Sequence, residues 1–206
     1  MVVRIVDALF AVLAPPRCAG CDERLARDAV FCAACMTTLD PPPSLPSGTS
    51  ASFAFGGAIA EAIRRYKFGP RPELARPLGR AIVESLPSPR DVDLVAPVPL
   101  HPRRLRARGF DQATLLARAV ARRLGRPLVL DRLARVTDTP QLARIDAEAR
   151  QRAVAGAFCA RLCDGVRVLL IDDVRTTGAT LDAAARAIAA VGGRASAHVL
   201  AATVRE

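Results

Sequence analysis

Residues 168–180 read Val168-Leu-Leu-Ile-Asp-Asp-Val-Arg-Thr-Thr-Gly-Ala-Thr180 and predict a strand, a turn and the start of a helix. The apolar run 168–171 does not alternate with polar residues, which is typical of a parallel strand covered on both faces. Asp172 and Asp173 stand where this strand is expected to end, and an Ala-rich helix is expected over 181–191. In an open α/β sheet, ligands bind at the carboxyl ends of strands, so the sequence predicts a ligand site here.

The turn after the two aspartates has the features of a phosphate-binding site. Backbone N–H groups at a helix N-terminus are free, and the helix dipole favours an anion. Gly178 allows the backbone to approach a phosphate closely, and the hydroxyls of the neighbouring threonines add donors. Two adjacent ribose hydroxyls would suit the two carboxylates. A phosphorylated ribose therefore matches both parts of the stretch.

This run of apolar residues, an acidic pair and Thr-Thr-Gly-Ala-Thr resembles the phosphoribosyl-pyrophosphate (PRPP) signature of type I phosphoribosyltransferases. The resemblance implies that the acidic pair, Asp172 and Asp173, holds the ribose hydroxyls as the catalytic residues, and that the turn holds the 5′-phosphate. The implied PRPP contacts are Asp172, Asp173, Val174, Arg175, Thr176, Thr177, Gly178, Ala179 and Thr180. An ordinary acidic strand–turn–helix is one alternative. A Walker B strand is another, but it needs a Gly-Lys-Ser/Thr phosphate loop, and the only lysine is Lys67.

The composition fits one α/β core with a small appendage. The chain has 206 residues, of which 51% are hydrophobic, enough to form a sizeable core. The formal net charge of +10 favours polyanionic partners, either nucleic acid or phosphorylated small molecules. No apolar run reaches the length of a membrane span, and residues 2–13 are expected to form a short amphipathic helix rather than a membrane anchor. We therefore expect a cytoplasmic protein.

Four cysteines near the N-terminus form two C-x-x-C pairs separated by ten residues, Cys18-Ala-Gly-Cys21 and Cys32-Ala-Ala-Cys35. Four thiolates in this arrangement suit a closed tetrahedral Zn²⁺ site, a zinc ribbon, with a structural rather than a chemical role. Disulfides and an iron–sulfur cluster are the alternatives. A cytoplasmic location disfavours the first, and the spacing differs from ferredoxin patterns. Cys159 and Cys163 lack a second pair and are expected to be buried or idle thiols.

The rest of the chain is expected to alternate strands and helices, which implies a mostly parallel sheet with helices on both faces. A segment rich in proline and serine predicts a linker before it. The expected parts are an N-terminal helix and zinc ribbon over 1–40, the linker over 41–52, and a phosphoribosyltransferase domain over 53–206. Strands are expected at 51–55, 91–99, 154–158, 166–172 and 194–204, and helices at 57–66, 71–86, 110–124 and 181–191. Lys67 is expected to close a helix end rather than to reach a phosphate.

A second phosphate-binding feature follows the strand expected at 91–99. Four arginines at positions 103, 104, 106 and 108 lie within six residues on a predicted loop. Their guanidinium groups suit bidentate phosphate contacts. A solvated basic loop is the alternative.

Two motifs in this region, Val98-Pro-Leu-His-Pro-Arg-Arg104 and Arg108-Gly-Phe-Asp-Gln112, resemble those of the competence-associated ComF family. That family joins a zinc ribbon to a phosphoribosyltransferase domain, so the resemblance covers nearly the whole chain. It implies a pyrophosphate-side group that consists of Pro99, Leu100, His101, Arg103, Arg104 and Arg108. Asp111 stands where the family usually has Asn, which keeps a helix-capping side chain but removes an amide donor.

The stretch Arg135-Val-Thr-Asp-Thr-Pro-Gln141, followed by Arg150, also resembles the family. The corresponding region of type I transferases is a mobile loop that closes over PRPP. The resemblance therefore makes Arg135, Gln141 and Arg150 candidates to meet the ligand, although a solvated loop explains each of them equally well. Ala153 replaces an Asn of the family pattern, so any polar contact of that Asn is absent.

The function that these resemblances imply is transfer of phosphoribosyl from Mg²⁺-bound PRPP to a nitrogen acceptor that no residue identifies. Mg²⁺ and arginine donors would stabilise the departing pyrophosphate. The family association implies a role in DNA uptake and partners in the competence machinery. Two alternatives remain: a non-catalytic module that binds single-stranded DNA through its phosphates, and a sensor that binds PRPP without turnover.

Overall fold

The computed structural model describes residues 16–26, 29–69, 71–87, 91–137, 156–162 and 164–203. Several of the expectations lie outside the described residues, namely the helix within 2–13 and the positions Gln141, Arg150, Ala153 and Cys163. None of the helices in the described ranges combines the length and apolar character needed to cross a bilayer.

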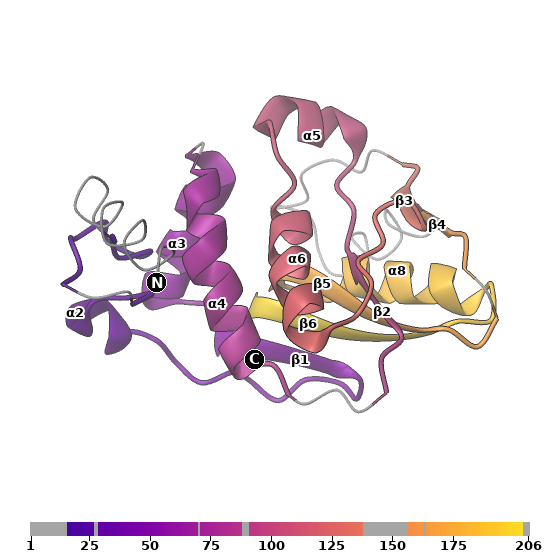
Figure 1. Ribbon diagram of the computed structural model, residues 1–206, viewed down its shortest axis with the longest axis horizontal. Coiled ribbons are helices and arrows are strands. Elements are labelled where there is room, and N and C mark those ends of the chain that lie inside the picture. Colours follow the sequence, from indigo (N-terminus) through magenta and orange to yellow (C-terminus); the bar gives the residue numbers. More distant parts are fainter. Residues whose placement is uncertain are drawn as a thin grey trace, which may run out of the picture.

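A four-stranded sheet of order β1-β6-β5-β2 forms the centre of the protein (Figure 1). Its strands are β1 Thr49–Ala54, β2 Leu94–Pro97, β5 Arg167–Arg175 and β6 Arg194–Ala202. Every neighbouring pair is parallel. The apolar run Val168–Ile171 lies in the central strand β5 and is buried throughout, as expected for a strand covered on both faces. The predicted parallel sheet is therefore confirmed.

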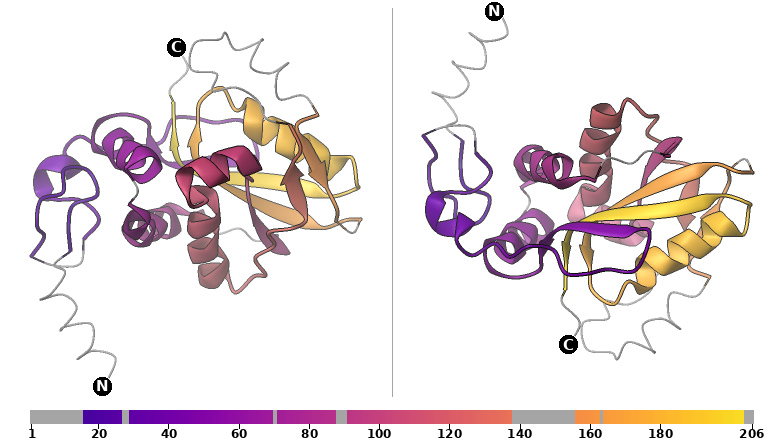
Figure 2. Two further views of the ribbon diagram at one scale, coloured as in Figure 1. Left: turned by 90° about the horizontal axis from the view of Figure 1, so that it is seen from above. Right: turned by 90° about the horizontal axis from the view of Figure 1, so that it is seen from below.

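Helices cover both faces of this sheet, as the sequence predicts. The helices are α2 Ala33–Met36, α3 Gly57–Phe68, α4 Ala75–Ser85, α5 Pro102–Arg108, α6 Gln112–Leu124 and α8 Ala179–Ala189, with a 3₁₀ turn over Pro72–Leu74. Leu169 and Ile171 share one core with α3, α4 and α6. Val168 and Leu170 point to the other face and share a second core with α8. Figure 2 shows α6 and α8 on opposite sides of the strands.

Two elements differ from the expected strand–helix pattern. The arginine-rich segment expected as a loop forms helix α5, because Pro102 occupies its first turn and Gly109 ends it in the left-handed conformation. The strand expected at 154–158 is instead β4, Phe158–Ala160, which pairs antiparallel with β3, Leu133–Arg135, in a separate two-stranded sheet.

The ends of two strands also differ from the expectation. Strand β5 continues beyond the expected end at Asp172 to Arg175, so Asp173 also lies within it, because its pairing with β6 runs on to Arg175↔Ala202. Strand β1 begins at Thr49, so residues 49–52 of the predicted linker belong to the sheet. The remaining division of the chain into parts stays a prediction.

The four-cysteine segment, residues 16–26 and 29–36, packs against α3 at one end of the molecule (Figures 1 and 2). We call it the cysteine module. Cys18 and Phe31 are buried in the same core as Ile59 of α3, and the rings of Phe31 and Phe53 meet edge to face at 6.3 Å. A Cβ atom at Gly20 would lie 3.0 Å from the Cβ of Ala58. The module therefore shares a core with the sheet domain.

A buried histidine joins two strands of the sheet. His198 of β6 is fully buried, with Nδ1 2.7 Å from the hydroxyl of Ser50 and Nε2 3.2 Å from that of Ser52. Burial disfavours the imidazolium and lowers the pKa of His198 to about 4. The neutral ring is therefore the form that the folded state holds at neutral pH.

This histidine predicts an acid-sensitive stability. Between pH 6.5 and 4 the unfolded chain binds a proton at His198 that the folded chain does not, so the free energy of unfolding should fall as the pH drops. The contribution of this group is about 3 kcal/mol across that window. Urea unfolding of the wild type and of His198→Gln measures it. The variant should show a correspondingly shallower pH dependence, and identical slopes would contradict the assignment.

Candidate functional site

The carboxyl edge of the parallel sheet brings together the segments in which the sequence places phosphate contacts. Val98 donates its N–H to the carbonyl of Ile171 at 2.9 Å, so the segment after β2 starts beside β5. On the other side of β5, Thr203 donates its N–H to the Arg175 carbonyl at 2.9 Å and its hydroxyl to the Thr176 carbonyl at 3.1 Å. The sequence reasoning did not identify Thr203, which fixes the start of the threonine turn.

The acidic pair has an internal counter-ion. Asp173 is only 6% exposed, and its Oδ1 lies 2.8 Å from Nζ of Lys67, which follows the buried part of α3. Asp172 accepts a hydrogen bond from the N–H of Asp173 at 2.8 Å. The expectation that Lys67 only closes a helix end is wrong. Its ammonium group instead reaches the central strand and neutralises one of the two carboxylates.

The second carboxylate of the pair resists ionisation. Burial, and next the negative charge of Asp173, raise the pKa of Asp172 to about 8, while the charge of Lys67 opposes this rise. The carboxyl group therefore carries a proton over much of the neutral range. Two adjacent carboxyl groups with one cation favour a ligand that supplies hydroxyl donors or further positive charge.

The threonine turn, residues 176–180, runs from the end of β5 into the first turn of α8. Gly178 precedes α8 and has φ +87°, a conformation that glycine adopts without strain. A Cβ atom there would lie 2.6 Å from Nη2 of Arg175, so Gly178 also makes room for this guanidinium. The hydroxyl oxygen of Thr177 accepts from the N–H of Ala179 at 3.4 Å. Arg175 is buried and brings positive charge against the turn, as an anion site requires.

Substitution of this glycine tests the tight approach of Arg175. Gly125 ends α6 with φ +60°, and a Cβ atom there would meet no other atom within 4 Å, so Gly125→Ala incurs only the backbone cost of about 1–2 kcal/mol. Gly178→Ala should cost about 0.5–1.5 kcal/mol more, because the buried guanidinium of Arg175 must also shift to another side-chain conformation. Urea unfolding compares the two variants. Equal losses of stability would contradict the proposed overlap.

The Arg108–Gln112 motif forms the join between α5 and α6. Asp111 caps α6, as the sequence predicts, with Oδ1 3.2 Å from the N–H of Thr114. Nη1 of Arg108 donates to Oε1 of the buried Gln112 at 2.7 Å, and the guanidinium carbon lies 5.7 Å from the ring centre of Phe68. Burial lowers the pKa of Arg108, while the charge of Asp173 opposes this change. Arg108 is therefore within electrostatic reach of the acidic pair.

The other predicted ligand contacts have different environments. Arg104 is close enough to Arg108 for its charge to lower the pKa of that group. Arg103 is exposed on α5, and the ring nitrogen Nδ1 of His101 accepts its N–H at 3.3 Å, which starts the helix. Pro99 and Leu100 are half-buried in the connection from β2 to α5. Arg135 lies in β3, with its guanidinium carbon 5.4 Å from the ring centre of Phe158.

The four cysteines of the module meet at one point. Their sulfur atoms all lie within 4.8 Å of one another, with Cys21 and Cys32 3.7 Å apart. A tetrahedral site with Zn–S bonds of about 2.3 Å requires sulfur atoms about 3.8 Å apart, so the donor set fits zinc. Burial raises the pKa of Cys18, but backbone N–H groups that include that of Cys32 lower it more strongly, to about 7. Cys159 is exposed in β4, so the expectation of a buried thiol is wrong and that of an idle one stays a prediction.

Comparison with known proteins identifies relatives of this chain. The family model for the phosphoribosyl transferase domain matches residues 111–205. The DNA utilization protein YhgH of Salmonella typhimurium is 31% identical over 171 residues, which are 80% of this chain and 74% of that protein. The competence protein ComFC of Bacillus subtilis is 34% identical over 103 residues, 50% of this chain and 41% of that protein. Among solved structures, the UMP synthase of Leishmania donovani is similar at 21% identity and a TM-score of 0.41, over 79% of this chain and 28% of that chain.

Three features define the class of this protein: the parallel sheet, the matched domain and the cysteine cluster. It is the class of proteins in which a cysteine module able to hold a metal ion precedes a domain with the phosphoribosyltransferase fold. Within that class, the chain belongs to the ComF family, which the identity with YhgH over most of both chains shows.

Proposed function

We propose that this protein binds Mg²⁺-bound PRPP at the carboxyl edge of the sheet and transfers its phosphoribosyl group to a nitrogen acceptor. One observation carries the proposal: the acidic pair, the threonine turn and Arg108 converge on this edge. An acidic pair, an anion-binding turn and guanidinium groups are complementary to the hydroxyls, the 5′-phosphate and the pyrophosphate of PRPP.

In the proposed mechanism Asp172 and Asp173 hold the two ribose hydroxyls, and the threonine turn holds the 5′-phosphate through backbone N–H groups and hydroxyls. Mg²⁺ bound to PRPP is part of the substrate and would offset the charge of the pyrophosphate. Arg108 and Arg104 add fixed positive charge on the pyrophosphate side. As the bond from C1 to the pyrophosphate breaks, the negative carboxylates stabilise the positive charge that develops on the ribose. The acceptor nitrogen then forms its bond to C1 and releases its proton to water, the pyrophosphate departs with its Mg²⁺, and no covalent enzyme intermediate is needed.

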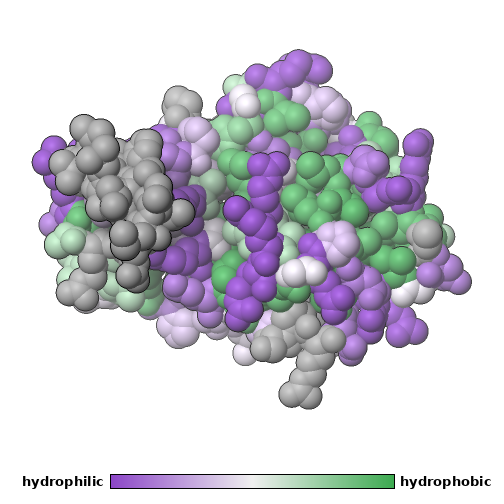
Figure 3. Space-filling view, viewed as in Figure 1, coloured by the Kyte–Doolittle hydropathy of each residue, from purple (hydrophilic) through white to green (hydrophobic). Residues whose placement is uncertain are grey.

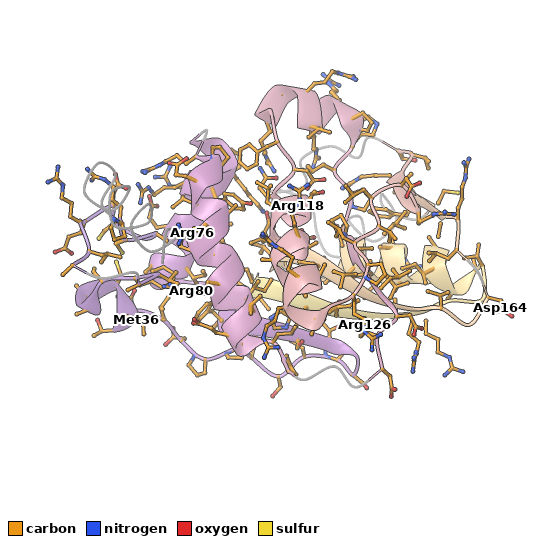
Figure 4. All side chains as sticks on the ribbon, in the orientation of Figure 1. Met36, Arg76, Arg80, Arg118, Arg126 and Asp164 are labelled. Carbon is orange, nitrogen blue, oxygen red and sulfur yellow. The ribbon has the colours of Figure 1, made fainter. Side chains whose placement is uncertain are left out.

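The test of this proposal is calorimetric titration with PRPP, with and without Mg²⁺. The wild type should bind in a Mg²⁺-dependent manner, and Asp172→Asn/Asp173→Asn should lose at least about a hundredfold in affinity, because both side chains lose the negative charge that strengthens their hydrogen bonds to the ribose hydroxyls. Asp164→Asn, an exposed carboxylate away from this edge (Figure 4), serves as the matched control and should bind normally. Unchanged affinity in the double variant would contradict the assignment of Asp172 and Asp173 as PRPP ligands.

The raised pKa of Asp172 predicts how PRPP affinity depends on pH. The proposed complex needs the carboxylate, whereas the free protein holds the proton below pH 8. Affinity should therefore rise by up to about tenfold per pH unit towards pH 8 and level off above it. Calorimetry from about pH 7 to about pH 9 avoids the titration of the ligand phosphate, which has a pKa of about 6. A flat profile over this range would argue against ribose contacts by Asp172.

A second candidate function is binding of single-stranded DNA, which the basic surface favours. Figure 3 shows hydrophilic side chains beside apolar ones over α5 and a column of hydrophilic side chains beside α6. Figure 4 places Arg76 and Arg80 on α4, Arg118 on α6 and Arg126 just after the end of α6. Steeply salt-dependent binding of an oligonucleotide, unchanged in the Asp172→Asn/Asp173→Asn variant, would support this candidate.

A further inference from the structure

The last turn of α3, residues 65–68, contacts four different parts of the protein. We call it the α3 end segment. Arg65 contacts the cysteine module, Tyr66 the start of α6, Lys67 the acidic pair and Phe68 the Arg108 guanidinium. No sequence motif marks this segment, and the proposed function uses none of it beyond the charge of Lys67. Its contacts link the cysteine module to the carboxyl edge of the sheet.

Arg65 holds the first C-x-x-C pair from outside. Its Nη1 lies 3.1 Å from the carbonyl oxygen of Ala19, 3.3 Å from that of Gly20 and 3.4 Å from that of Cys18. Its Nη2 pairs with the carboxylate of Asp22 at 2.9 Å. The side chain is only 13% exposed, so these bonds are partly shielded from water. These carbonyls belong to the first C-x-x-C pair itself. The guanidinium of Arg65 can therefore reach all of them only when residues 18–21 have their folded conformation.

Tyr66 and Lys67 contact the sheet domain on the other side of this helical turn. The hydroxyl of the fully buried Tyr66 donates to the carbonyl of Gln112 at 3.2 Å, and its ring lies 5.5 Å from that of Phe110. Lys67 pairs with Asp173 at 2.8 Å. Residues two apart in a helix point about 200° away from each other, so Arg65 and Lys67 reach in nearly opposite directions from one rigid turn. A movement of this turn that releases the knuckle also moves the ammonium away from Asp173.

We propose that the cysteine module is a positioning element of the carboxyl-edge site. The first C-x-x-C pair, with metal bound, holds Arg65. Through the α3 end segment this contact keeps Lys67 paired with Asp173 and Tyr66 bonded to the start of α6. Lys67 is thus a positioning residue for the acidic pair. The effect on ligand affinity rests on the proposed function, because PRPP is the ligand of that site. The mechanical link does not depend on it.

Hydrogen–deuterium exchange of the full chain tests the link without any ligand. Under reducing conditions, the zinc-loaded protein is compared with protein stripped by a strong chelator. Metal removal should speed exchange in the cysteine module and also in residues 61–69 and 109–116. Zinc-loaded Arg65→Ala should show the same faster exchange in the last two regions. The matched control is Arg64→Ala, an exposed arginine that pairs only locally with Glu61 at 2.7 Å and should behave as wild type. Faster exchange confined to residues 16–36 would overturn the proposal.

Calorimetry with Mg²⁺ and PRPP then tests the consequence for the site. Zinc-loaded Arg65→Ala and Lys67→Met should each bind PRPP about tenfold more weakly, whereas Arg64→Ala should bind normally. Metal content is measured for every variant, so that a loss of zinc is not mistaken for a loss of positioning. If Arg65→Ala cannot retain zinc, Arg65→Lys is measured instead. Its ammonium keeps the positive charge but lacks the planar set of guanidinium donors that reaches several carbonyls.

The outcomes separate this proposal from the proposed function. Wild-type affinity in zinc-loaded Arg65→Ala would overturn the positioning role while leaving PRPP binding intact. Failure of the wild type to bind PRPP would defeat the proposed function, and the exchange measurement would still decide whether the cysteine module positions the α3 end segment.

Discussion

The ion pair between Lys67 and Asp173 connects the outer helix α3 to the central strand β5 at the place where two carboxyl groups are adjacent. A nearly buried carboxylate beside a second one is unfavourable unless a cation compensates it, and removal of one partner of such a pair typically costs several kcal/mol. The ammonium group of Lys67 supplies this compensation to Asp173. The raised pKa of Asp172 shows that the same cation does not fully offset a second negative charge beside it. The position of α3 therefore affects the chemistry of the site directly.

The parallel sheet determines which other groups reach this position. Because every strand runs in the same direction, the segments after β2, β5 and β6 begin at one edge, although they are far apart in the sequence. The segment after β2 supplies α5 and Arg108, and that after β5 supplies the threonine turn. Thr203 after β6 fixes that turn. The groups that we propose to bind three parts of PRPP thus depend on a single register of four strands.

The central strand, the turn and the cysteine cluster could be predicted from the sequence because each is encoded locally. An apolar run, a glycine between threonines and paired C-x-x-C spacings act within a few residues. Helix α5 was also encoded locally: Pro102 in its first turn and Gly109 at its end are a start and a stop signal, which the density of arginines obscured. The length of β5 depends on pairing with β6, and the partner of Lys67 depends on the packing of α3. Both are tertiary effects that no local pattern records.

The cysteine module, the α3 end segment and the acidic pair form one continuous set of contacts, at one end of which we propose that PRPP binds. A crystal structure of the zinc-loaded protein with Mg²⁺ and PRPP tests that binding most directly. We expect the 5′-phosphate within hydrogen-bond distance of the N–H groups of residues 176–180 and the ribose hydroxyls on Asp172 and Asp173. PRPP bound elsewhere, or absent from this edge at saturating concentration, would contradict the proposed site.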